Sequence, residues 1–256
     1  MGKTKTYFQM NKKTQNKGEI YIYGDIVSSK WDETDVTAVG FKNELNQLGD
    51  VSEIDVHINS AGGNVFEGHA IYNMLKMHKA KVNIYVDALA ASIASVIAMS
   101  GDTIFMHKNS FMMIHNSWVM TLGNSKDLRE TADLLDKTDQ SSNNAYLDKA
   151  TNLSEAELKQ LLEAETWLTA DEALEKGLAD EILGASEIAA SISKDSYHMF
   201  KHVPENIEKD IDKITAVSDI QVGNTVGTFQ ETMSQVEKEA RAIIKQNAEN
   251  LKLLYK

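Results

Sequence analysis

The feature that most constrains the fold of this chain is an alternation of strand-like and helix-like segments across residues 19–116. Apolar residues at every second position predict strands, and apolar residues three or four positions apart predict helices. Strands that alternate with helices form a mostly parallel sheet covered by the helices, so the sequence predicts an α/β fold. The predicted strands span 19–26, 52–60, 81–88, 103–106 and 110–116, and the predicted helices span 33–48, 65–79 and 91–101.

The part of the chain that follows is predicted to be mainly helical. Residues 125–150 predict a long helix. A further helix is expected to begin at Ser154, because Glu157 completes a capping box with that residue. Residues 167–183 predict a strand, a helix closed by a glycine, and a last strand.

The chain divides into three predicted regions. Residues 1–18 are rich in lysine and are expected to form a flexible basic arm. Residues 19–186 carry the strand–helix alternation and are expected to form one domain. Residues 187–256 lack that alternation and are predicted to be a partly helical tail. A heptad-like stripe in this tail predicts either one docked amphipathic helix or a coiled-coil, partner-binding segment, and consists of Phe229, Met233, Val236, Ala240 and Ile243.

Composition excludes several classes of site and partner. The chain has no cysteine, which excludes disulfides, zinc–thiolate sites and thiol catalysis. The formal net charge of -12 argues against nucleic-acid binding. No apolar run reaches the roughly 18 residues that a membrane-spanning helix needs, and the basic start lacks the apolar core of a signal peptide. A cytoplasmic protein without membrane contact is therefore expected.

The stretch "DALAASIASV" (87–96) is the first candidate for chemistry. A serine at a strand-to-helix turn is exposed at the end of the strand, as in a nucleophile elbow. Ser92 occupies that turn, whereas Ser95 lies inside the predicted helix, where its hydroxyl is expected to serve packing or a backbone carbonyl. Taken alone, the stretch favours the interpretation that its small residues let a helix start pack closely.

Two further stretches could complete a site. "INSAGGNVFEG" (58–68) places two glycines after a strand, where backbone N–H groups can face a ligand or an oxyanion, or can simply form a tight turn. "FMMIHN" (111–116) ends a predicted strand at His115, within reach of a serine at the same sheet edge. His107, at another strand end, is its nearest rival, and a structural histidine is the alternative for both.

Four separated motifs together resemble a known family. "NSAGGNVFEGHAIYNML", "LAASIAS", "MMIHN" and "WLTADEALEKGLADEI" occur in the order and spacing of the Clp protease proteolytic subunit family, and the match is most similar to phage and prophage head maturation proteases. The resemblance implies a Clp protease/crotonase-like fold over residues 19–186. It further implies that the long helix at 125–150 is a protruding handle through which rings of a homo-oligomer stack around a chamber.

The resemblance also implies a serine protease triad. Ser92 matches the nucleophile and His115 the general base. The third member of the family's triad is an aspartate, and here that position holds Glu165, which is one methylene longer. Asp171 is a nearby alternative acid.

The same resemblance implies an oxyanion hole. The backbone N–H groups at Gly62, Gly63 and Ile93 match its donors, and no metal or organic cofactor is implied. Ala61 departs from the proline that many family members carry before these glycines, which removes some rigidity from the loop but no donor.

Four functions are compatible with these observations. The first is a serine endopeptidase that processes phage capsid or scaffold protein in the bacterial cytoplasm, and the second is a proteolytic subunit fed by an ATP-dependent unfoldase. The third is a crotonase-like enzyme that stabilises a thioester enolate without a serine. The fourth is a non-enzymatic assembly or scaffold component organised by the tail.

Overall fold

The computed structural model describes residues 10–14, 16–186 and 200–204 of the chain. All of these residues belong to one structural unit, residues 1–208. Within this part of the chain no helix is long and apolar enough to cross a membrane. The predicted heptad-like stripe from Phe229 to Ile243 lies outside the described residues.

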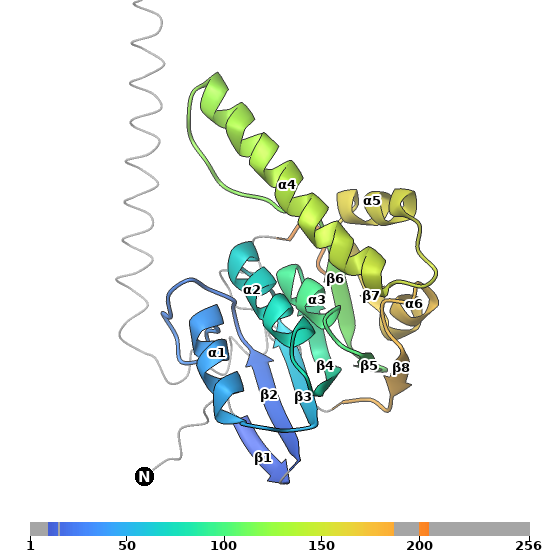
Figure 1. Cartoon of the computed structure of the whole chain (residues 1–256). Helices are drawn as coiled ribbons and strands as arrows, with labels where there is room; N and C mark the ends of the chain where they lie inside the picture. Colours follow the sequence, from blue (N-terminus) through green and yellow to red (C-terminus); the bar gives the residue numbers. More distant parts are fainter. Residues whose placement is uncertain (1–9, 15, 187–199, 205–256) are drawn as a thin grey trace, which may run out of the picture. The chain divides into compact units, whose positions relative to one another are not determined.

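A mainly parallel sheet of eight strands forms the centre of the described unit (Figure 1). The order is β1-β2-β3-β4-β5-β8, with β6 pairing to β4 and β7 pairing to β6. Only the β1–β2 and β6–β7 pairs of this sheet are antiparallel. The strands are β1 Met10–Thr14, β2 Lys17–Tyr23, β3 Glu53–Ser60, β4 Lys81–Ala91, β5 Thr103–His107, β6 Phe111–Ile114, β7 Thr166–Thr169 and β8 Glu181–Leu183. The predicted α/β fold is confirmed.

Six helices accompany the sheet in the described residues, and they are α1 Ala38–Gln47, α2 Val65–Lys76, α3 Ile93–Ala98, α4 Ser125–Lys149, α5 Glu155–Glu163 and α6 Ala170–Glu175. Figure 1 shows α4 projecting beyond the sheet, as expected of the long helix at 125–150. The predicted capping box at the start of α5 is also confirmed, because the Ser154 side chain accepts from the Glu157 N–H and the Glu157 carboxylate accepts from the Ser154 N–H.

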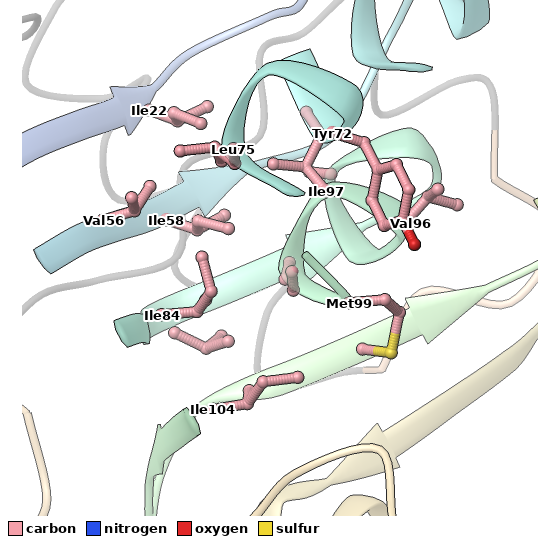
Figure 2. Close-up of a cluster of buried hydrophobic side chains, with 14 of the residues drawn as sticks. Ile22, Val56, Ile58, Tyr72, Leu75, Ile84, Val96, Ile97, Met99 and Ile104 are labelled. Carbon is pink, nitrogen blue, oxygen red and sulfur yellow. The ribbon is translucent and has the colours of Figure 1, made fainter. Parts of the chain in front are cut away.

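The hydrophobic core lies between one face of the sheet and helices α2 and α3 (Figure 2). Alternate residues of the strands point to this face because side chains of a strand alternate sides. The side chains that Figure 2 labels are Ile22, Val56, Ile58, Ile84 and Ile104 from the strands, and Tyr72, Leu75, Val96, Ile97 and Met99 from the helical side. Each fully buried aliphatic side chain contributes about 1.5–3 kcal/mol to folding, so this layer holds the sheet and the two helices together.

Strand β4 has two different neighbours along one edge, and this arrangement positions the site. Its first half, Asn83–Val86, pairs with Thr103–Met106 of β5. Its second half, Leu89–Ala91, pairs with Phe111–Met113 of β6. The sequence predicted that the strand ends at 88, but pairing with β6 extends it to the residue before Ser92. The end of β4 therefore meets the end of β6, where His115 follows.

Residues 10–14 differ from the expectation for the N-terminal region. The sequence placed them in a basic arm spanning 1–18, whereas they form β1, which pairs antiparallel with β2. Antiparallel strands need only a short connection, so these two adjacent segments can pair as a hairpin at the edge of the sheet. Residues 1–9 lie outside the described part of the chain.

Candidate active site

Ser92 is the single residue between strand β4 and helix α3. Its backbone lies at φ 53° and ψ -130°, a conformation that costs a non-glycine residue about 1–3 kcal/mol. The Ser92 N–H donates to the Met113 carbonyl of β6 at 2.9 Å, which anchors the turn to the neighbouring strand. The strained turn thus holds the hydroxyl at the carboxyl end of a parallel strand, where the sequence predicted a nucleophile.

The His115 ring lies directly beside this hydroxyl. Its Nε2 atom is 2.7 Å from Ser92 Oγ, a hydrogen-bond distance. Burial of the ring lowers the pKa of His115 below its ordinary value; the negative charges of Glu165 and Asp139 oppose this, and the positive charge of Lys201 adds to it. Burial therefore favours the neutral imidazole, which is the form that can accept the serine proton.

The rival histidine of the sequence analysis is held elsewhere. His107 contacts the Gly184 carbonyl through Nδ1 at 2.7 Å, and its Nε2 atom lies 3.6 Å from Asp87. His57 also contacts Asp87, at 2.9 Å. These two histidines share a carboxylate on β4, whereas His115 contacts the serine.

Glu165 lies between α5 and β7, with its side chain in the interior. The residue is 7% exposed, and its backbone has a positive φ of 51°. Carboxylate oxygen Oε1 accepts the backbone N–H groups of Lys201 at 2.6 Å and of His202 at 2.9 Å. Among the described residues no hydrogen bond joins Glu165 to His115, although its charge acts on the ring. The alternative acid, Asp171, is exposed in the first turn of α6.

The glycine loop approaches Ser92 closely enough to supply an oxyanion donor. A Cβ atom on Gly62 would lie 2.7 Å from the Ser92 Cβ, so only glycine fits there. The Gly62 N–H donates to Ser60 Oγ at 3.1 Å. Two hydrogen bonds join this loop to Ile26, through the Gly62 carbonyl and the Asn64 N–H, and no hydrogen bond within the described residues engages the Gly63 N–H.

Ile93 offers the second donor. Its N–H is the first of helix α3 and has no acceptor within the helix. Of the three donors expected from the sequence, the Gly63 and Ile93 N–H groups are therefore the pair left for an oxyanion, because Ser60 engages the Gly62 N–H. The described residues hold no cluster of three or more His, Asp or Glu side chains arranged for a metal ion.

A cavity of about 310 Å³ opens beside the serine and the histidine. Gly63, Ser92, Ile93 and His115 form one part of its wall. The apolar part of the wall includes Ile93, Val96, Trp118, Val119, Leu134 and Leu135. The serine–histidine pair and the two candidate N–H donors therefore line a largely apolar pocket, an arrangement suited to acyl transfer.

Comparison with known proteins agrees with this arrangement. The sequence profile of the Clp protease family matches residues 5–186, a span that includes Ser92, His115, Glu165 and the glycine loop and covers well over half of the chain. The chain belongs to the Clp protease family.

Two curated relatives are both named as ATP-dependent Clp protease proteolytic subunits. This chain is 34% identical over 134 residues to the ATP-dependent Clp protease proteolytic subunit 1 of Protochlamydia amoebophila, covering 51% of this chain and 65% of that protein. It is 33% identical over 133 residues to the ATP-dependent Clp protease proteolytic subunit of Deinococcus radiodurans, with the same two coverages. The chain thus spans just under two thirds of the length of these relatives. Neither name refers to phage head maturation, the subgroup that the sequence analysis favoured.

Three contributors to the site of this Clp family member were not found from the sequence. Asp139, on α4, acts on His115 by its charge and accepts the Ser117 N–H at 2.6 Å. Lys201 and His202 reach Glu165 through their backbone, from beyond the residues that match the family. Every residue except proline carries a backbone N–H, so residue type does not reveal a backbone donor. The distance along the chain from His115 to α4 or to residues 201–202 also follows no recognisable pattern.

Proposed function

We propose that this chain is a serine endopeptidase that hydrolyses peptide bonds in polypeptide substrates. The observation that carries the proposal is the 2.7 Å contact between Ser92 Oγ and His115 Nε2 at a strained strand-to-helix turn. A strained backbone that persists at one serine, with an imidazole nitrogen on its hydroxyl, is typical of a nucleophile. The enolate chemistry of crotonase-like enzymes has no use for this serine–histidine pair.

The geometry supports a two-step acyl transfer. The hydroxyl of Ser92 attacks the substrate carbonyl carbon while its proton passes to His115 Nε2. The negative oxygen that forms is stabilised by the N–H groups of Gly63 and Ile93. The imidazolium then protonates the leaving amine as the carbon–nitrogen bond breaks. In the second step His115 takes a proton from water, the water oxygen attacks the acyl-enzyme, and the proton returns to Ser92 Oγ as the acid product leaves. Glu165 is the acid that stabilises the imidazolium in this proposal.

The cavity supports a preference for apolar side chains before the scissile bond. Its volume of about 310 Å³ accommodates a large aliphatic or aromatic side chain, and residues such as Val96 and Leu135 line it. We expect peptides with leucine, methionine or phenylalanine at this position to be cleaved at least about tenfold faster than peptides with aspartate, because burying a charge in an apolar pocket is unfavourable. Equal rates for the two classes would contradict this assignment.

The handle supports a homo-oligomer. Apolar side chains stand exposed on α4 and on the loop before it, with Met120 at 86% and Leu122 at 98% exposure, joined by Leu128 and Leu134. Large apolar side chains exposed along a projecting segment are suited to an interaction surface, and a second copy of this chain is the occupant that we propose. Native mass measurement tests this, with a multiple of the chain mass expected and a monomer contradicting it.

Serine-directed labelling tests the proposed chemistry. A fluorophosphonate probe is expected to label Ser92, and Ser92→Ala is expected to abolish both labelling and peptide cleavage. Ser95→Ala is the matched control, because Ser95 lies three residues away and its hydroxyl bonds inside the protein; this variant is expected to keep the label. A folded wild-type chain that takes no label, and that binds an acyl-CoA thioester, would favour the crotonase-like alternative.

Two roles remain for such a peptidase, which are protein degradation together with an ATP-dependent unfoldase and the processing of capsid protein. The names of the relatives favour the first role. Addition of such an unfoldase with ATP is expected to accelerate degradation of a folded protein substrate, while short peptides are cleaved without it. Cleavage of folded capsid or scaffold protein at defined sites, unaffected by an unfoldase, would instead favour the head maturation assignment.

A deletion variant tests the non-enzymatic alternative. Loss of biological function on deletion of 226–256, with function kept in Ser92→Ala, would favour an assembly or scaffold component.

A further inference from the structure

A short segment from beyond the family match lies against the catalytic residues. This segment, residues 200–204, is called the clasp below. The Phe200 ring meets the His115 ring edge-on, with centroids 6.1 Å apart and an interplanar angle of 64°. It also meets the Trp167 ring of β7, with centroids 5.7 Å apart. The clasp therefore touches both the base and the strand that follows Glu165.

The backbone of the clasp holds one oxygen of the Glu165 carboxylate. The N–H groups of Lys201 and His202 both donate to Oε1, at 2.6 and 2.9 Å. Glu165 is only 7% exposed, so few water molecules can solvate its charge. A buried carboxylate needs hydrogen-bond donors, and bonds to an ionised acceptor are about twice as strong as neutral ones. Two successive backbone donors therefore contribute strongly to where this oxygen lies.

A glutamate at this position has more need of such support than an aspartate. Its extra methylene adds one rotatable bond, so the carboxylate can occupy more positions around His115. Two donors on Oε1 restrict those positions and leave the second oxygen, Oε2, with its lone pairs for another donor. The cavity beside Ser92 is lined, among the described residues, by groups between Gly63 and Tyr146, so the clasp leaves the substrate pocket open.

We propose that the clasp is a positioning element, in which the backbone N–H groups of Lys201 and His202 hold the Glu165 carboxylate in place for His115. The inference rests on the proposed serine peptidase function and deepens it. Among the described residues the clasp donates no hydrogen bond to Ser92 or His115, and its two backbone donors act through Glu165. Residues beyond the matched family domain thereby complete the acid–base arrangement of the site.

Proline substitution tests the proposal because it removes a backbone N–H. In the full-length chain, Lys201→Pro is compared with Lys201→Ala, which loses the same side chain and charge but keeps the N–H. The measured quantity is the second-order rate constant of fluorophosphonate labelling at Ser92. We expect Lys201→Pro to label about tenfold more slowly than Lys201→Ala, the order of effect of one hydrogen bond to a charged group. Equal rates for the two variants would overturn the proposal.

The same comparison in a Glu165→Gln background separates positioning from a general structural effect. If the clasp acts through the carboxylate charge, the difference between the proline and alanine variants falls below about twofold there. A difference that persists in this background would overturn the proposal, because the clasp would then act independently of Glu165. Labelling stays measurable for slow variants, since probe concentration and time can both be raised.

The pH dependence of the labelling rate separates positioning from a purely structural role, because a structural role would not change it. The charged groups that act on His115 are Glu165, Asp139 and Lys201. Both variants lack the Lys201 charge and keep Asp139, so the change in charge near His115 is the same in the two. We expect the acid limb of the labelling rate to lie at lower pH in Lys201→Pro than in Lys201→Ala, because a displaced carboxylate stabilises the imidazolium less. Coincident acid limbs would count against the clasp.

A second pair of variants controls for a folding defect. His202→Pro and His202→Ala repeat the comparison at the other donor, and near-ultraviolet circular dichroism monitors the fold. Unfolding of both proline variants would itself overturn a positioning role, because it would make the clasp a requirement for folding. Wild-type protein without Ser92-dependent labelling would refute the proposed function, whereas labelled wild type with no proline effect refutes the clasp alone.

Discussion

The hydroxyl of Ser95 lies 2.6 Å from the phenol oxygen of Tyr146, and both side chains are almost completely buried. Ser95 gives its single proton to the Ser92 carbonyl at 2.5 Å, so the Tyr146 hydroxyl is the donor in the second bond. Burial raises the pKa of Tyr146 far above its ordinary value. Helix α3 is thereby joined to α4 next to the turn that carries Ser92, as a structural role for Ser95 requires.

Ser95→Ala is expected to destabilise the protein by about 1–3 kcal/mol, because the buried Tyr146 hydroxyl loses its acceptor. Tyr146→Phe is expected to cost about 0.5–1.5 kcal/mol. The double variant is expected to cost less than the sum, since both changes remove one interaction. Urea denaturation measures all three free energies of unfolding, and strictly additive effects would contradict the pairing.

The rate of fluorophosphonate labelling is expected to fall at acid pH with a midpoint below about 6.5, the ordinary pKa of histidine. The sign follows from His115, whose pKa is lowered chiefly by burial, so the reactive neutral form persists to lower pH. Glu165→Gln is expected to move the midpoint down further, because it removes a charge that favours the imidazolium. A midpoint above that of an ordinary histidine would contradict the burial of the base.

Gly63→Ala is expected to reduce the free energy of unfolding by at least about 2 kcal/mol. Gly63 has a positive φ of 134°, and a Cβ atom there would lie 2.2 Å from the Ile26 carbonyl oxygen. Displacement of the loop also moves an oxyanion donor, so labelling is expected to slow at least about tenfold. Gly49→Ala is the matched control at φ 65° with open space around it; a cost of about 1 kcal/mol and unchanged labelling are expected.

Glu165→Gln is expected to slow labelling at least about a hundredfold, because a neutral amide cannot stabilise the imidazolium. Asp171→Asn is the matched control, since Asp171 is exposed in the first turn of α6. We expect this change to alter labelling less than about twofold and to cost at most about 1 kcal/mol through the helix dipole. The reverse order of effects would identify Asp171 as the acid.

Most of the fold could be predicted because its signals are local. The strand 52–60 and the helix 65–79 follow from apolar periodicity, and the structure places β3 at Glu53–Ser60 and α2 at Val65–Lys76. The predicted helix at 33–48 starts only at Ala38, because the Thr37 side chain caps it by accepting the Gly40 N–H. Such boundary shifts arise when a cap overrides a pattern that continues upstream.

The candidate site was predictable only as far as its residue types. Ser92 and His115 stand out by their places at strand ends, and the structure brings them into contact. The choice between Gly62 and Gly63 depends on which N–H is already engaged, and that is decided by Ser60 Oγ. The charge of Asp139 reaches His115 from a helix whose direction no local pattern specifies.

The sequence by itself determined the order of strands and helices, the serine at the turn and the histidine after the strand, because periodicity and turn chemistry act between near neighbours. Only the tertiary structure decided that β4 changes its pairing partner from β5 to β6, which brings the ends of β4 and β6 together. It also decided that residues 201 and 202 hold Glu165, thirty-six and thirty-seven positions away. Contacts of this kind depend on how separate elements pack, and packing energy is non-local in the sequence.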